Sequence, residues 1–157
     1  MSEQSNKEQF AEAYNRTLGL IARREHSAAE LRRKLSARGY PEQICEAVLR
    51  QLQERNLQDD SNFAEEFIAS KKRRGFGPLK ITAELQQHQI SRDLLRELLD
   101  EQSDDWLQGC RQAMQRKYGD RAATDQRERL RRSRFLQQRG FAASMVAKVL
   151  RENSEDV

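Results

Sequence analysis

The fold is decided by residues 35–49, which read LSARGYPEQICEAVL and return twice more along the chain. The second copy, LQQHQISRDLLRELL, occupies residues 85–99, and the third, LQQRGFAASMVAKVL, occupies residues 136–150. In each copy the apolar residues follow one another at steps of four, four and one, which is helical spacing. A pattern repeated every fifty residues or so indicates an array of small helical units. Such an array presents a long surface and no deep pocket, which favours a long partner over a small substrate.

The composition of the chain agrees with an all-α fold. Of its 157 residues, 36% are hydrophobic and 34% are charged, so narrow apolar stripes can be buried but not one thick core. Two prolines and seven glycines leave long stretches of good helix formers, and no run of alternating β-branched residues is present. We therefore predict an elongated, modular tandem array of three three-helix repeats.

Helix-boundary signals divide this array into segments. Ser27 and Glu30 form a predicted capping box, Gly39 suits a left-handed helix end, and Thr124 is placed to cap a basic helix. The sequence predicts a frayed polar leader at 1–9, repeats at 10–57, 58–102 and 103–153, and a loose tail at 154–157.

The charge distribution says more about partners than the net charge of +4. Residues 1–60 carry ten basic and ten acidic side chains, residues 61–104 carry seven and eight, and residues 105–157 carry twelve and seven. The basic excess therefore lies in the last third, which suits a partner that carries phosphates or an acidic protein groove. A solvated helical surface remains an open alternative on charge alone.

Several functional classes are not supported by the sequence. It contains no phosphate loop, no HExxH pair and no nucleophile elbow, so we predict that the protein is not an enzyme. Cys45 and Cys110 are isolated, which indicates neither a disulfide framework nor a zinc site. We expect a cytoplasmic monomer without cofactor, metal or membrane partner, and we expect His26 and His88 to have capping or surface roles.

Six short motifs, in order and correctly spaced over nearly the whole chain, resemble the RecX family of bacterial RecA regulators. They are REHSAAEL at 24–31, DDSNFA at 59–64, FI at 67–68, GFGP at 75–78, KYG at 117–119 and FLQQRGF at 135–141. The sequence departs from the family pattern at Asn56 and Gln58. Gln89 stands where the other copies have glycine, so we expect another kind of turn there. Arg132 replaces Leu31 and Ile81 of the other copies, which leaves the register of the third repeat open, with its stem expected along the apolar stripe and its charge outside.

The resemblance implies a curved repeat protein that lies in the helical groove of the RecA–single-stranded DNA filament, across several protomers. There it would inhibit RecA ATPase, filament extension and strand exchange, and so modulate recombination, DNA repair and the SOS response. The implied partners are RecA and single-stranded DNA, with double-stranded DNA left open. A stand-alone helical DNA-binding protein is the second hypothesis, because the turns between helices loosely mimic a helix-turn-helix. A structural adaptor is a third.

Two basic segments are the candidate contacts. The central one surrounds Phe76, for which we favour a core position, and comprises Lys71, Lys72, Arg73, Arg74 and Lys80. These charges also suit simple compensation of a helix C-terminus. In the last repeat, Arg127, Arg131 and Arg134 share one side of a predicted helix. Their neighbours in the sequence complete the candidate set, namely Arg111, Arg116, Lys117, Arg121, Arg129 and Arg132.

Overall fold

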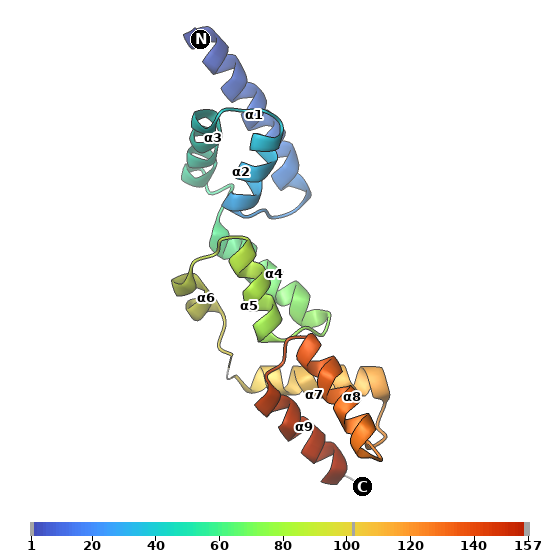
Figure 1. Cartoon of the computed structure of the whole chain (residues 1–157). Helices are drawn as coiled ribbons and strands as arrows, with labels where there is room; N and C mark the ends of the chain where they lie inside the picture. Colours follow the sequence, from blue (N-terminus) through green and yellow to red (C-terminus); the bar gives the residue numbers. More distant parts are fainter. Residues whose placement is uncertain (1, 102, 156–157) are drawn as a thin grey trace. The chain divides into compact units, whose positions relative to one another are not determined.

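A computed structural model describes residues 2–101 and 103–155, and every regular element among them is an α-helix (Figure 1). The helices follow one another in three groups of three, as the sequence predicts. The first group is α1 (Glu3–Arg23), α2 (Ala28–Ala37) and α3 (Glu42–Glu54). The second is α4 (Asp60–Arg73), α5 (Pro78–Gln87) and α6 (Arg92–Leu98), and the third is α7 (Asp104–Tyr118), α8 (Gln126–Gln138) and α9 (Ala143–Glu155).

The turn after the second helix of each group has the same left-handed backbone. The φ angles are 91° at Gly39, 60° at Gln89 and 106° at Gly140. The expectation of a different turn at Gln89 is therefore wrong, because glutamine adopts the conformation that glycine adopts in the other copies, at a cost of about 1 kcal/mol. Asn56, with φ of 58°, is left-handed in the same way.

Helix starts follow the predicted caps with one correction. The capping box is present, since the Glu30 N–H donates to Ser27 Oγ at 3.0 Å and the Ser27 N–H donates to Glu30 Oε1 at 3.4 Å. The cap of α8 is Asp125, not Thr124, because Asp125 Oδ1 accepts from the Glu128 N–H at 2.8 Å.

The chain ends also differ from expectation. The predicted leader is helical from Glu3 onward, with Ser2 as the cap of α1, whereas Met1 lies outside the described residues. At the other end α9 extends to Glu155, and residues 156–157 of the predicted tail lie outside the described residues.

Two compact units make up the fold. The first contains Met1–Glu66 and His88–Ile90, and the second contains Phe67–Gln87 and Ser91–Val157. In the first unit, α1 and α2 both pack on α3, around a core that includes Ala13, Leu35, Val48 and Leu52. In the second unit, α7, α8 and α9 pack on one another. The unit boundary falls within α4, so the predicted second repeat is shared between the two units.

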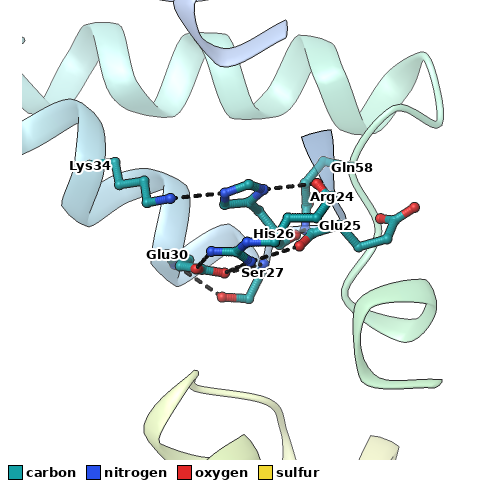
Figure 2. Close-up of polar contacts among 7 residues, drawn as sticks. All are labelled: Arg24, Glu25, His26, Ser27, Glu30, Lys34 and Gln58. Atoms are coloured by element: carbon teal, nitrogen blue, oxygen red, sulfur yellow. Dashed lines mark hydrogen bonds and ion pairs between the residues drawn. The ribbon is translucent and has the colours of Figure 1, made fainter. Parts of the chain in front are cut away.

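A network of polar contacts, which we call the polar junction, surrounds the start of α2 in the first unit (Figure 2). Arg24 donates to both carboxylate oxygens of Glu30. Gln58, which is buried, donates to the His26 carbonyl at 3.2 Å and to Asp60 Oδ1 at 2.9 Å. The same Asp60 oxygen accepts from the Ala28 N–H at 2.9 Å, so it links the first turn of α4 to that of α2. Gln58, where the sequence departs from the family pattern, thus has a structural role.

The His26 ring lies inside this junction and is only 2% exposed (Figure 2). Its Nδ1 is 3.0 Å from the Arg24 carbonyl and its Nε2 is 2.9 Å from Lys34 Nζ. Because the ammonium can only donate, Nε2 accepts and the proton is on Nδ1, which is the neutral ring. Burial is the main cause that lowers the pKa of His26. The hydrogen bond to the Arg24 carbonyl and the charge of Glu30 raise this pKa, whereas the charges of Arg24 and Lys34 lower it further.

We predict that acid lowers the stability of the fold through protonation of His26. Its pKa is lower in the folded chain than the ordinary 6.5, so the unfolded chain binds more protons below that value. The free energy of unfolding should therefore fall between about pH 7 and pH 5. His26→Asn keeps a donor near the Arg24 carbonyl and cannot titrate, so its pH dependence in this window should be shallower. Urea titrations across the window measure the difference, and equal slopes for the two proteins would contradict the assignment. The lowered pKa of Glu30 acts separately, because its contribution is lost only below about pH 4.5.

Candidate functional site

The turn between α4 and α5 carries Phe76, whose ring is surrounded by cations. Lys71 Nζ lies 5.0 Å from the ring centroid and Lys80 Nζ lies 4.9 Å from it. The guanidinium carbon of Arg74 is at 5.3 Å and that of Arg139 is at 4.6 Å. All four distances are within the range of cation–π attraction. The Phe76 side chain is only half-buried, so the expectation that it occupies a core position is wrong.

Arg139 reaches this ring because two glycines allow two turns to cross. The Gly77 N–H donates to the Arg139 carbonyl at 2.8 Å, and the Leu79 N–H donates to the Gly140 carbonyl at 3.0 Å. A Cβ placed on Gly77 would lie 2.5 Å from the Gly140 oxygen, and one on Gly140 would lie 2.5 Å from Lys80 Cβ. No side chain fits at either position, so the close backbone approach requires glycine.

A second ring, Phe135 on α8, continues the same surface. The Arg139 guanidinium carbon lies 5.4 Å from its centroid, and Lys117 Nζ lies 5.6 Å from it. Between these groups is a pocket of about 150 Å³, lined by Arg74, Gly75, Ala113, Arg116, Lys117, Phe135 and Arg139. We call the six cationic side chains that surround the two rings or line this pocket the two-ring cation cluster. Its members are Lys71, Arg74, Lys80, Arg116, Lys117 and Arg139.

The cation cluster is poorly neutralised. Lys71 Nζ lies 3.2 Å from the Glu84 carboxylate. For the five other members no acidic side chain within salt-bridge distance is found in the part of the chain that the structure describes. Like charges gathered at short range destabilise one another, and the aromatic rings compensate only in part. An anion that enters the pocket is therefore favoured electrostatically.

The face of α8 predicted to carry arginines does so. Arg127, Arg131 and Arg134 are exposed, and none of them forms an ion pair within residues 2–101 and 103–155. Leu130, between them in the sequence, is also exposed, at 52%. The face therefore offers cations together with apolar surface. Arg129 is exposed as well.

Arg132 is not a surface residue. It is 0% exposed and occupies the core position that Leu31 and Ile81, also 0% exposed, occupy in the other groups. Its Nη1 donates to the Arg121 carbonyl at 2.9 Å and to Asn153 Oδ1 at 3.2 Å, and its Nη2 donates to Glu128 Oε1 at 2.9 Å. The register of the third group is thus kept. The expectation of an exposed head is wrong, because these acceptors surround the guanidinium inside the fold, and Arg132 leaves the candidate set.

The remaining candidates differ in how much they are engaged. Arg111 forms a two-pronged pair with Glu152, at 2.7 and 2.8 Å, whose hydrogen bonds raise the pKa of Arg111 and lower that of Glu152. Lys72 Nζ lies 4.7 Å from the Trp106 ring centroid. Arg73 and Arg121 have exposed side chains. The structure therefore brings together Lys71, Arg74, Lys80, Arg116 and Lys117, and places the α8 arginines on a face of their own.

The candidate contacts predicted from the sequence do not include Arg139 or Phe135. Both lie in the FLQQRGF motif, where Arg139 directly precedes the glycine of the repeated turn. The glycines in FLQQRGF and GFGP are the one sequence signal for a close approach of the two turns. Nothing in the spacing of the two motifs along the chain predicts that they meet.

A metal site, a membrane-spanning helix and a nucleophilic thiol are the other features that we considered for the described residues. Within the described residues no group of three metal-ligating side chains is present, and no helix is long and apolar enough to cross a membrane. Burial raises the pKa of the Cys110 thiol to about 12, so it is a poor nucleophile.

The fold and these surfaces define a class, the all-α proteins built from tandem three-helix repeats with exposed cationic faces. Models of the first, second and third three-helix domains of RecX match residues 13–52, 59–99 and 103–150. The chain belongs to the RecX family of regulatory proteins.

Individual relatives agree with the family models. The regulatory protein RecX of Ectopseudomonas mendocina is 38% identical over 85% of this chain and 89% of its own. That of Halorhodospira halophila is 40% identical over 88% of this chain and 86% of its own. A crystal structure of RecX from Lactobacillus salivarius has the same fold, with a TM-score of 0.79 and 16% identity over 94% of this chain and 98% of that one. A second crystal structure of regulatory protein RecX has a TM-score of 0.79 at 20% identity, over 95% of this chain and 79% of that one.

Proposed function

We propose that this protein binds the RecA–single-stranded DNA filament and inhibits RecA ATPase, filament extension and strand exchange. It would thereby modulate recombination, DNA repair and the SOS response in the cytoplasm. Membership of the RecX family supports regulation as the role. The observation that carries the filament as target is the exposed arginine face of α8, which has no acidic neighbours within salt-bridge distance in the described chain. Such a face suits a polymer that offers phosphates and carboxylates together.

An ATPase titration tests the proposal. RecA is assembled on single-stranded DNA, and this protein is added at increasing, sub-stoichiometric amounts while ATP hydrolysis is followed. A gel shift with naked DNA is run beside it. Inhibition well below one molecule per RecA protomer, with weaker binding to naked DNA, is the expected result.

The second candidate is a stand-alone DNA-binding protein, which the dense cations of the second compact unit favour. It would be supported by tight binding to naked DNA with RecA ATPase unchanged, and that outcome would replace the filament proposal.

Charge reversal on α8 should weaken inhibition. The variant R127E/R131E/R134E removes three exposed cations and adds three anions that repel the filament. We expect the half-inhibitory concentration for RecA ATPase to rise by about tenfold or more. The matched control is K7E/R33E/R50E, which makes the same change of net charge at exposed positions of α1, α2 and α3. If both variants inhibit equally, at unchanged helicity by circular dichroism, the α8 face is not the contact.

A further inference from the structure

We propose that the two-ring cation cluster binds a phosphate group of a single-stranded nucleic-acid backbone. This assignment rests on the function proposed above and identifies the ligand of one part of the surface. Its side chains come from the end of α4, the α4–α5 turn, the start of α5, α7 and the residue that follows α8, segments that can be found in Figure 1 and that all belong to the second compact unit. None of its six cations belongs to the arginine face of α8, and one of them is Arg139.

The size of the pocket argues for one anionic group of a larger ligand. At about 150 Å³ it is smaller than the sites that enclose whole small molecules. Four basic side chains line it, namely Arg74, Arg116, Lys117 and Arg139, and they come from three separate chain segments. A single phosphate fits such a site while the rest of the polymer lies outside.

The rings hold the cations in place without neutralising them. The Arg139 guanidinium lies near both Phe76 and Phe135, so its plane is constrained while its N–H groups remain donors. The Arg116 head group lies beside the Gly75 turn, since a Cβ at Gly75 would be in van der Waals contact with Arg116 Nη1 at 3.8 Å. Side chains ordered before binding lose less entropy when the anion arrives.

Charge density favours nucleic acid over an acidic protein segment. Of the six cations in the cluster, Lys71 alone has an acidic side chain, Glu84, within salt-bridge distance among the described residues. A nucleic-acid strand carries a charge at every nucleotide, and sites for single strands combine such cations with aromatic side chains. A protein strand seldom supplies carboxylates at that density.

The test is a binding titration with a fluorescein-labelled oligothymidylate, followed by anisotropy at several salt concentrations. The variant R74Q/R116Q removes two exposed cations of the pocket, whereas the control R33Q/R50Q removes two exposed cations from α2 and α3. We expect the first variant to weaken binding by about tenfold or more and to flatten the salt slope by about 0.7 for each lost contact. The control should bind within about twofold of the wild type. Thermal unfolding of each variant verifies the fold.

Three outcomes would overturn the assignment. In the first, R74Q/R116Q and R33Q/R50Q lose affinity for the oligonucleotide equally. In the second, R74Q/R116Q binds the oligonucleotide as tightly as the wild type does. In the third, poly-glutamate binds the wild type as tightly as the oligonucleotide does, and its affinity falls in R74Q/R116Q. RecA ATPase gives the independent readout. A wild-type protein that binds the oligonucleotide through this pocket but leaves RecA unaffected would contradict the proposed function and support the phosphate site.

Discussion

Gly77→Ala should lower the free energy of unfolding of the second compact unit by about 2–3 kcal/mol. The added Cβ would meet the Gly140 oxygen at 2.5 Å and the Gly140 carbonyl carbon at 2.6 Å, and these are backbone atoms. A flexible side chain would rotate away, but backbone atoms can give way only if the two turns separate. Separation also removes the hydrogen bonds from Gly77 to Arg139 and from Leu79 to Gly140.

The matched control is Gly19→Ala, which adds the same methyl group within α1. A Cβ at Gly19 meets no atom within 4 Å, and alanine is the better helix former. This variant should be as stable as the wild type, or more stable by up to about 1 kcal/mol. Urea denaturation followed by circular dichroism measures both. A Gly77→Ala protein with the stability of the wild type would show that the two turns do not need their close approach.

The same substitution has a functional consequence. Arg139 faces the Phe76 ring only because the α8–α9 turn lies against the α4–α5 turn. A Gly77→Ala protein that remains folded should therefore bind oligothymidylate more weakly, although no cation has been removed. The stability of the turn crossing and the proposed anion site thus depend on the same contact.

Arg132→Ala should destabilise the protein by about 3–5 kcal/mol. The arginine is 0% exposed, so alanine leaves a cavity where Leu31 and Ile81 fill the core in the other groups. It also removes the donors that serve the Arg121 carbonyl, Asn153 and Glu128.

Arg132→Met separates the effect of the cavity from that of the charge. A long apolar side chain fills much of the space and requires no charged partner, so it should cost clearly less than alanine. Glu128 keeps its bonds to Thr124, and Asn153 keeps its bond to the Ala123 N–H, so neither polar group is left without a partner. Thermal unfolding ranks the two variants. Equal loss in both would mean that the hydrogen bonds of the guanidinium, and not its volume, stabilise this core.

The methionine variant also tests whether Arg132 is buried. Because Arg132 does not reach the surface, a folded Arg132→Met protein should keep the proposed inhibition of RecA, unlike R127E/R131E/R134E. Loss of inhibition at unchanged stability would contradict the buried position.

Much of the fold was predictable because its signals are local. The thrice-repeated spacing predicts the helices and their order, and Ser27 with Glu30 predicts a helix start that the structure confirms. The exposure of Arg127, Arg131 and Arg134 follows from helical spacing in the same way. At Gln89 the local rules failed with little energetic consequence. Gln89 takes the glycine conformation, since its side chain remains exposed and the strain is modest.

The sequence by itself determined the three helical repeats, the glycine turns at Gly39 and Gly140 and a basic last third, because these depend on residues within a few turns of one another. Only the tertiary structure decided that Arg132 is buried and that Arg139 joins Phe76. Both depend on which distant segments pack together. Gly77 and Gly140 permit their turns to touch, but periodicity within one helix carries no information about the partner of a turn. The physical reason is that helix formation is governed by neighbouring residues, whereas the meeting of cations and rings is governed by close packing between segments far apart in the chain.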